Sequence, residues 1–537
     1  MGLKFTEMAK GMENKQQDDF GKGLNLFTRD TMLKENEAPV AYNVWAVGKN
    51  SVAKRPGVAR FCTIAGGNPI DGIGSYYAGA TRKLIAMCGG TLYDVTSGSA
   101  VALSAAPLTA GNFSAGYRAD FCQAGGSLFV ANGKQNIRVV DSGFTVRDQT
   151  GSVIADKLIF YKSCLWAAGE PSSGNETRLY RSGSDTNIGN FTYGATANPL
   201  ATSVYISKSD GQYITGFFKH QDFLYVTKER SLWRSNVGTD TYQLITNEMI
   251  DPARGCDSHH SIDSVDNDNF MFAEQGVQAT GYEPNILDQI RTNIVSLRID
   301  PDLKSIQKSR LADVEGIYFD NHYYLSYTSG GGSVNDVIKV YDRQRLGWWE
   351  FQIAIDGVFT GASCFSEFKN ASGETKLYFG SPVDGSIYYF DDTLKQDQGY
   401  AILTDYKTPK LSFGDYSQMK FFLDVELYFG KTPGNPTINV FIDGTLAATS
   451  QPSIGSSGSA GTGIEKTGVG KTGVGGGSLT VTDDGGGDFV RIPLGVSGRN
   501  IQVQITDEDI TGTKSWEINS MHFHFKKLSP LYQPNTQ

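Results

Sequence analysis

KLIAMC, at residues 83–88, is the first of seven short apolar segments that recur along this chain and decide its fold. The other six are SLFVAN (127–132), CLWAAG (164–169), FLYVTK (223–228), FMFAEQ (270–275), YYLSYT (323–328) and KLYFGS (376–381). Repeats of roughly 40–50 residues made of short strands are typical of a β-propeller, where each repeat forms one four-stranded blade. A single blade leaves its faces uncovered, so the blades are expected to close into a ring. The sequence therefore predicts an all-β chain with a β-propeller of about seven blades.

Several of these segments are followed by a turn and a second apolar strand, as at TLYDV (91–95), NIRVV (136–140), SLWRS (231–235) and IYYF (387–390). The composition of the 537 residues agrees, because aromatic residues make up 12% and there are 63 glycines. Aromatic side chains suit half-buried strands, and glycine suits tight turns. Long runs with apolar residues at helical spacing are missing, so helix is expected to be a minor component.

The chain is expected to divide into an arm, a propeller and a sandwich, because its length exceeds what one hydrophobic core usually holds. Residues 1–36 are polar and irregular and form the expected arm, and the propeller is expected over residues 37–395. NVWAV (43–47) and SVAKR (51–55) predict a hairpin that closes the propeller by completing its last blade. The polar stretch at 169–190 is expected to be a loop between strands.

Residues 396–537 show a different pattern, with five segments that alternate between apolar and polar residues as the strands of a small β-sandwich do. These segments are FFLDVELYF (421–429), TINVFIDG (437–444), FVRIPL (489–494), NIQVQITD (500–507) and WEINSMHFHF (516–525). A glycine-rich insert at 453–488 interrupts them. It has too little apolar surface to order by itself, so we expect a flexible hairpin tip or a segment that orders only against a neighbouring subunit.

The charge of the chain limits its partners. A net charge of −9 and a pI near 5.3 argue against a protein that grips nucleic acid through its phosphates. No run of about 18 apolar residues exists, so no membrane span is expected. The charged N-terminus lacks the apolar core of a secretory signal, and the match of Gly2 and Thr6 to a myristoylation pattern is interpreted as chance. The six scattered cysteines are expected to be buried free thiols.

For each possible catalytic or binding motif, a purely structural interpretation is favoured over a functional one. GVGKTG (468–473) is similar to a phosphate-binding loop, but Glu465 stands where that motif needs glycine, so low-complexity sequence is the better interpretation. Trp348 and Trp349 could form a sugar platform, although their place after VIKVYDRQR favours blade core. Among 57 acidic residues, spacing alone identifies no glycosidase pair. The chain is interpreted as a non-enzyme with no cofactor and no catalytic or metal-binding residues.

Two groups of histidines could suit a metal. His522 and His524 lie two apart in an expected strand and share a face, but a third ligand near them is not evident, so solvent-facing histidines are the better interpretation. His259 and His260 lie close to the carboxylates of DSVDND (263–268). That spacing lacks the glycine turn and the distal glutamate of a calcium loop, so a polar loop is expected there.

Three features together resemble the β-propeller nozzle or hub proteins of bacteriophage tails, the family that includes tail tubular protein B. The first is an opening pattern that matches at Gly-Leu-Asn (23–25), Asn-Glu-Ala (36–38), Asn-Val-Trp (43–45) and Lys-Arg-Pro-Gly (54–57). The second is the blade strand VIKVYDRQRLGWWEF (337–351), and the third is a terminal sandwich that ends in SWEINSMHFHFKKL (515–528). The resemblance spans nearly the whole chain, although the long arm and the glycine insert depart from it.

The resemblance implies a virion structural protein made in the host cytoplasm. Several copies, with a hexamer expected, would form a homo-oligomeric ring below portal and adaptor proteins, with tail fibres or spikes at its periphery. DNA would pass through the ring without sequence-specific binding, and the ring would retain the packaged genome until ejection. An acidic lumen suits that role, because it repels phosphate.

The arm has few apolar anchors of its own, so Leu24, Leu26 and Phe27 are candidates for contacts with a neighbouring subunit, together with Gly468 and Gly470 of the insert. Two alternative functions stay open. One is a propeller that binds or hydrolyses host-surface carbohydrate, and the other is a collar or receptor-binding component of the particle.

Overall fold

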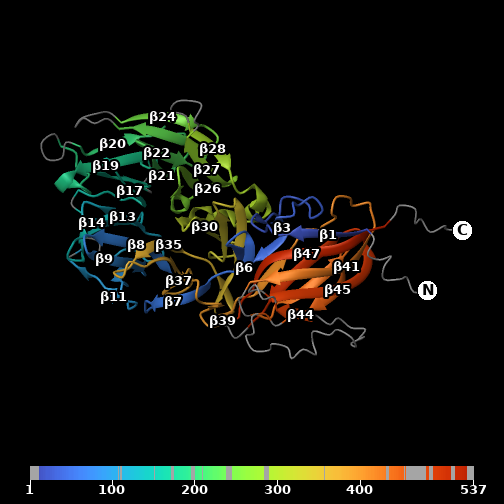
Figure 1. Cartoon of the computed structure of the whole chain (residues 1–537). Helices are drawn as coiled ribbons and strands as arrows, with labels where there is room; N and C mark the ends of the chain where they lie inside the picture. The colour runs from blue at the N-terminus through green and yellow to red at the C-terminus, as the bar shows by residue number, and fades with distance from the viewer. Residues whose placement is uncertain are drawn as a thin grey trace, which may run out of the picture. The chain divides into compact units, whose positions relative to one another are not determined.

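The computed structural model of the chain describes residues 11–528 apart from 107, 109–111, 150, 171–173, 195–199, 209, 238–244, 283–289, 356, 431–433, 453, 455–478, 483–487 and 510–513 (Figure 1). It divides into two compact units. Unit 1 holds Met1–Gly57, Val340–Gly357 and Asp391–Gln537, and unit 2 holds Val58–Lys339 and Val358–Phe390. Strands dominate the described residues of both units, and α2 (Asp300–Lys304) is the one α-helix among them. No described helix is long and apolar enough to cross a membrane.

Unit 2 consists of antiparallel sheets whose strands follow one another in chain order. The first sheet contains β8 (Ile70–Ala78), β9 (Thr81–Cys88), β10 (Thr91–Asp94) and β11 (Val101–Ala102). The second contains β13 (Asp120–Ala124), β14 (Ser127–Ala131), β15 (Arg138–Val140) and β16 (Thr145–Asp148), with β12 (Ser104–Ala105) parallel to β16. The third contains β17 (Lys157–Tyr161), β18 (Cys164–Ala168), β19 (Arg178–Ser184) and β20 (Thr202–Tyr205). This order along the chain is what consecutive hairpins produce.

The remaining sheets of unit 2 repeat that plan. They contain β21 (Ile214–His220), β22 (Phe223–Lys228), β23 (Leu232–Asn236) and β24 (Thr246–Asp251); β25 (Asp263–Val265), β26 (Asp268–Ala273), β27 (Gly276–Tyr282) and β28 (Ile290–Ile294); β29 (Glu315–Phe319) and β30 (His322–Tyr327); and β35 (Cys364–Lys369), β36 (Thr375–Gly380) and β37 (Ser386–Asp391), followed by β7 (Gly57–Thr63). Between the last two groups, β31 (Val337–Asp342) runs across the boundary between the units, and β34 (Val358–Thr360) opens the second segment of unit 2.

The seven recurring segments of the sequence all form strands, and each is the second strand of its group. Their matching apolar residues are at most 1% exposed: Leu84, Leu128, Leu165, Leu224, Met271, Leu325 and Leu377. Neighbouring sheets cover both faces of these strands, which explains why the segments read as almost continuous apolar runs. The expectation of repeated strand groups is confirmed at these positions.

Each sheet of unit 2 packs its apolar side chains against the next sheet. One buried cluster joins the first and second sheets through Met87 and Leu128, and another joins the third and fourth through Trp166 and Leu224. The last sheet packs against the first, where Cys364 and Ile70 share a cluster. The chain is therefore mostly β with many sheets, and no described sheet closes on itself.

Unit 1 contains two open sheets assembled from distant parts of the chain. One has the order β44 (Leu479–Thr482), β45 (Asp488–Gly498), β41 (Lys420–Phe429), β47 (Glu517–Lys527), β6 (Ser51–Lys54) and β5 (Val44–Val47), with β1 (Met12–Gln17) also paired to β47. The other has β32 (Gly347–Phe351), β4 (Val40–Tyr42), β40 (Thr404–Lys407), β46 (Ile501–Asp507), β42 (Thr437–Ile442) and β43 (Thr445–Ser450), with β2 (Gly23–Leu24) and β3 (Glu37–Ala38) beside β32. In the strand order of this sheet, β29, β30 and β31 precede β32. Short strands β33 (Ile353–Ile355), β38 (Gln396–Asp397) and β39 (Tyr400–Ala401) also belong to this unit.

The N-terminal hairpin of β5 and β6 lies in unit 1 and not in the last sheet of unit 2. Its strand β6 pairs with β47, where Ala53 faces Glu517, and Figure 1 shows the blue strand beside the red one. The strand that follows β37 in the last sheet is instead β7, which comes directly after the hairpin. This differs from the sequence expectation by one strand, because the Pro56-Gly57 turn ends the hairpin before the next strand begins.

Two further expectations differ from the structure, on the N-terminal arm and on the stretch at 169–190, and one on Trp348 and Trp349 agrees with it. Residues 11–36 are not a free arm, since β1 pairs along its length with β47. Trp348 and Trp349 are fully buried, as expected, in β32, the strand that follows β31 in the chain-order group β29-β30-β31-β32 of one sheet. The stretch at 169–190 contains the strand β19, whose alternating polar residues hid it from sequence patterning. The five expected sandwich segments do form strands β41, β42, β45, β46 and β47.

Candidate functional site

The stretch that carries the family resemblance supplies a buried polar network in unit 1. Asn43 adopts a left-handed backbone conformation with φ of 55°. Its side-chain oxygen accepts hydrogen bonds from Arg55 Nε and from the N–H of Gln352, both at 2.8 Å. Arg55 is fully buried and forms a bidentate ion pair with Asp397, with 2.9 Å between Nη1 and Oδ1. Through these hydrogen bonds the buried guanidinium of Arg55 fixes the segments around Asn43, Gln352 and Asp397 relative to one another.

Two more residues of that stretch are fixed in unit 1. Lys54 is buried and its Nζ lies 3.0 Å from Asp507 Oδ2. Gly23 has a φ of 58°, and a Cβ there would lie 2.3 Å from the backbone oxygen of Trp348, so a larger residue would not fit. The residues on which the resemblance depends are therefore required by the fold of unit 1.

A polar cavity of about 670 Å³ lies in unit 2 near the starts of β13, β17 and β21. Its cations are already paired, because Lys157 lies 2.6 Å from Asp156 and Lys308 lies 2.9 Å from Glu274. Burial raises the pKa of Asp257, another lining residue, to about 6. Mixed charge and paired groups make this cavity a poor match for a simple anion or cation.

A second cavity of about 270 Å³ shares Arg118 and His260 with the first. Arg118 donates to the Glu315 carboxylate and, at 2.9 Å, to the backbone oxygen of Ser363. Burial, followed by the charge of Arg118, holds the pKa of His260 well below its usual value. Burial also raises the pKa of Asp71, at the wall of this cavity, to about 6. A neutral imidazole beside a paired guanidinium indicates a structural network.

In three strand groups of unit 2, a carboxylate on the first strand accepts a hydrogen bond from the backbone of another group. The three acceptor–donor pairs are Asp120 with the N–H of Leu158 (2.5 Å), Asp263 with that of Tyr318 (2.7 Å) and Glu315 with that of Phe365 (3.1 Å). Each such bond satisfies a backbone donor at the junction of two sheets. These acids therefore connect sheets, which gives them a role other than a glycosidase pair.

The group around His259 does not assemble as a metal site. His259 Nε2 lies 3.2 Å from Asp120 Oδ2, whereas His260 lines the cavities. Asp263 faces the next sheet, and Asp266 sits in a turn with φ of 54°. Among the described residues, these side chains do not come together as ligands. Residues 263–268 form β25, a turn at Asp266 and the start of β26, and so a hairpin in place of the expected polar loop.

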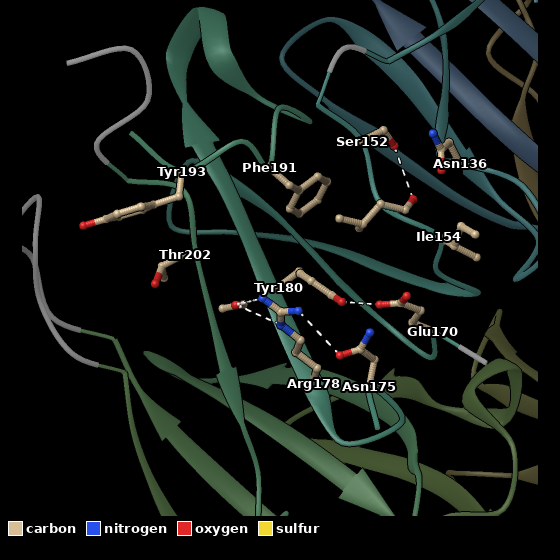
Figure 2. Close-up of a pocket in the computed structure, with 12 residues that line it drawn as sticks. Asn136, Ser152, Ile154, Glu170, Asn175, Arg178, Tyr180, Phe191, Tyr193 and Thr202 are labelled. Atoms are coloured by element: carbon tan, nitrogen blue, oxygen red, sulfur yellow. Dashed lines mark hydrogen bonds between the residues drawn. The ribbon is translucent and has the colours of Figure 1, made fainter. Parts of the chain in front are cut away.

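A cleft of about 690 Å³ lies beside the third sheet of unit 2 (Figure 2). Arg178 on β19 donates through Nε and Nη2 to Ser203 Oγ on β20, at 3.0 and 2.8 Å. Its guanidinium lies over the ring of Tyr180, 4.8 Å from the centroid. Figure 2 shows Phe191 and Tyr193 across the cleft from Arg178. The cleft therefore presents aromatic faces opposite a fixed fork of hydrogen-bond donors.

Other polar side chains that line the same cleft form hydrogen bonds beside Arg178. Asn175 Oδ1 accepts from the Tyr205 hydroxyl at 3.1 Å, and the Tyr180 hydroxyl donates to Glu170. Burial and the Glu170 carboxylate raise the pKa of Tyr180. Glu170 is the one carboxylate among the described lining residues, and two are needed for ordinary glycoside hydrolysis. The chemistry of the cleft suits binding of a neutral polyhydroxylated ligand.

The structure separates the five predicted interface residues. Leu24 is fully buried within unit 1, which removes it from a surface role, and Leu26 is partly buried. Phe27 is 57% exposed and stays a candidate for a contact with another subunit. Gly468 and Gly470 lie outside the described residues, as does the GVGKTG segment.

Sequence reasoning missed the partners of His524. Asp424 and Glu426 on β41 lie beside it in the neighbouring strand, and donor atoms of the three residues lie within 4.8 Å of one another. His522 and His524 are both partly buried on the polar face of β47, and Met521 and Phe523 on the other face are fully buried, as expected. The pairing of two distant strands places carboxylates beside His524 that spacing along one strand did not indicate.

Comparisons with known proteins give no family. No family model matches the chain, and no protein of curated function matches it. One solved structure that is similar to it is the extracellular domain of a hybrid two-component system from B. thetaiotaomicron, with 11% identity and a TM-score of 0.39 over 80% of this chain and 51% of that one. The chain thus spans about half the length of that structure, and a likeness at this level supports no functional inference.

Proposed function

We propose that this chain is a structural protein of a bacteriophage tail, a nozzle or hub subunit that forms a ring around the DNA channel. The observation that supports this best is the buried network of Asn43, Arg55 and Asp397. Residues that carry the resemblance to the nozzle family, such as Asn43 and Arg55, also make the buried contacts of unit 1. A shared fold signature of this kind favours a shared architecture.

In this proposal unit 2 is a seven-bladed β-propeller. Support comes from seven strand groups with the same order, from the packing of each group on the next, and from the packing of Cys364 in the last sheet on Ile70 in the first. Strand β7 would complete the last blade, which is how an N-terminal strand commonly closes a propeller ring. Such a unit leaves only short sheet edges exposed.

The acidic charge fits the proposed channel. A net charge of −9 on each subunit would surround the DNA with like charge, so that the genome slides without binding to the wall. Portal and adaptor proteins would lie on one side of the ring, and fibres or spikes would attach at its periphery. The subunits would be synthesised in the host cytoplasm and function in the virion.

Native mass spectrometry of the purified chain, with negative-stain images of the same sample, tests the proposal. We expect a closed homo-oligomer, with a hexamer the leading stoichiometry, and no retention of duplex DNA at physiological salt. Phe27→Asp should weaken the ring, whereas Leu446→Asp, a change of the same kind at a residue that is 53% exposed, should not. A stable monomer that turns over glycans would exclude the nozzle.

A second candidate function is recognition of host-surface carbohydrate, which the cleft of Figure 2 favours. Aromatic rings stack on the apolar faces of sugars, and Arg178 and Asn175 are placed to bind hydroxyl groups. A glycan array with the full chain tests it. Binding that Tyr193→Ala abolishes and Tyr213→Ala leaves unchanged would support this function, and an array without signal would exclude it.

A further inference from the structure

We propose that the polar face of β41 and β47 in unit 1 carries a site for a divalent first-row transition metal, bound by Asp424, Glu426 and His524. The inference does not depend on the proposed function, because it uses only side chains within one sheet. It assigns a role to a histidine for which the sequence alone shows no third ligand.

The geometry of the three side chains is that of a compact donor set. His524 Nδ1 lies 2.6 Å from Asp424 Oδ1 and 3.9 Å from Glu426 Oε1. Asp424 and His524 are direct cross-strand partners, and Glu426 is the next outward residue of β41. Directly opposite side chains on paired strands are close enough to share one ion. Two oxygens and one imidazole nitrogen on one side of an ion leave its other positions open to water.

A β-bulge places Asp424 in this set. The register of β41 shifts between Phe422 and Asp424 against both neighbouring strands, β45 and β47. Before the shift Phe422 faces the core, and after it Val425 and Leu427 do. The extra residue therefore moves Asp424 onto the outward face together with Glu426. Bulges are frequent beside functional sites because they redirect a side chain in this way.

The charge balance also favours a cation. The Asp424 carboxylate is only 5% exposed, so its charge needs compensation. Arg491 Nη2 lies 2.6 Å from Asp424 Oδ2, and Arg491 Nε lies 3.7 Å from Glu426 Oε1. One guanidinium therefore opposes two carboxylates on this face. The Arg491 side chain is 52% exposed and has room to turn outward when an ion enters.

The donor set identifies the class of metal. Calcium and magnesium prefer oxygen ligands alone, whereas a nitrogen with two carboxylates suits zinc, manganese or cobalt. His522 lies two residues from His524 on the same face and directly opposite Glu426. Its ring packs at a tilt against Tyr428 with 4.7 Å between centroids, and it is not one of the clustered donors. It therefore provides a matched control for His524.

The test uses the full chain after removal of metals with a chelator. Cobalt(II) is titrated as a spectroscopic probe, because its visible absorption reports nitrogen and oxygen ligation, and zinc binding is measured by calorimetry. We expect one ion for each chain. His524→Gln and Asp424→Asn should each weaken binding by about tenfold or more, whereas His522→Gln should change it by less than about threefold.

Arg491→Gln separates a metal site from a simple salt-bridge network. Because Arg491 competes with the ion for the same carboxylates, its removal should strengthen cobalt binding, whereas it would only weaken a structural network. Circular dichroism of the chelated variants establishes that each is folded. The proposal is overturned if the wild type binds no cobalt, if His522→Gln and His524→Gln weaken binding equally, or if Arg491→Gln weakens it.

Discussion

Unit 2 and unit 1 reach a packed core by opposite routes along the chain. In unit 2 most strands pair with strands that are adjacent in sequence, so most of its sheets can form from local hairpins, and β7 beside β37 is the main exception. In unit 1 strands from both ends of the chain are paired, and the hydrogen bond between Ser51 and Asn519 joins residues 468 positions apart. Unit 1 holds its distant segments with buried ion pairs such as Arg55–Asp397, whereas unit 2 holds its sheets with apolar clusters, carboxylate–backbone hydrogen bonds and the ion pair of Arg118 with Glu315.

The largest expected effect of a single substitution is therefore in unit 1. Arg55→Ala would leave the buried Asp397 carboxylate without a counter-charge and would free the side chain of Asn43. Removing one partner of a buried pair costs about 3–5 kcal/mol. We expect a loss of unfolding free energy at the upper end of this range, measured as a lower urea midpoint of tryptophan fluorescence. Insoluble protein would be the extreme form of the same result. Four of the six tryptophans lie in unit 1, so fluorescence mainly reports this unit.

The double variant Arg55→Met with Asp397→Leu serves as its control. Replacing both members of a buried pair by apolar residues of similar volume is often neutral for stability. The double variant should recover most of the lost free energy of unfolding. Equal instability of the single and double variants would show that Arg55 acts through another contact.

A core substitution in unit 2 is expected to have a slightly smaller and more local effect. Leu224 is fully buried between the third and fourth sheets, and Leu224→Ala should destabilise by about 3 kcal/mol through the lost burial and the cavity. The change should appear in far-ultraviolet dichroism, with the fluorescence transition of unit 1 little altered. Leu165→Ala, at the equivalent position of the neighbouring sheet, should have a similar effect. A shift of both transitions together would show that the units unfold as one.

The pH dependence of unit 2 gives a third comparison. Burial raises the pKa values of Asp71, Asp257 and Asp263 to about 6. The unfolded carboxyl groups titrate near pH 4, so between about pH 4 and 6 the folded state binds more protons than the unfolded state. The free energy of unfolding should therefore fall as the pH rises through this window. Asp263→Asn should reduce that slope in urea titrations, and an unchanged slope would contradict the assignment.

The smallest effect is expected at the start of unit 1. Strand β1 pairs along its length with β47, so its amides should exchange slowly with solvent even in a single subunit. The free-arm interpretation instead predicts fast exchange that slows only on assembly. Hydrogen exchange with mass spectrometry on dissociated subunits separates the two. Phe27→Ser, at an exposed side chain, should leave the melting temperature within about 2 °C of the wild type.

The two routes also explain what the sequence could predict. The recurring segments were recognisable because each second strand is buried on both faces, as at Leu84 and Leu325. Partners of β6 could not be assigned, because an apolar hairpin such as NVWAV–SVAKR suits any open sheet edge. The choice of β47 is made by tertiary contacts, including the hydrogen bond from Ser51 to Asn519 on that strand. Strand β19 was missed because Arg178 and Arg181 make its sequence polar, as in a loop.

Candidate sites were less predictable than the fold. His522 and His524 were noticed, but their carboxylate partners lie about 100 residues away, brought close by the pairing of β41 with β47. The bulge at Asp424 has no sequence pattern of its own, and without it Asp424 would face the core. The cleft beside β19 depends on the guanidinium of Arg178 lying over the ring of Tyr180, which no spacing rule indicates.

The pairing of β1 and β6 with β47 sets an order of events during synthesis. Unit 2 has all of its strands once residue 391 has left the ribosome, whereas the first strands of unit 1 must wait until β47 is made. At about 5–20 residues per second, the roughly 140 residues in between take on the order of ten seconds. During that time Val52 and Ala53 of β6 lack their partners on β47, so the nascent chain should be a chaperone client through its first 57 residues.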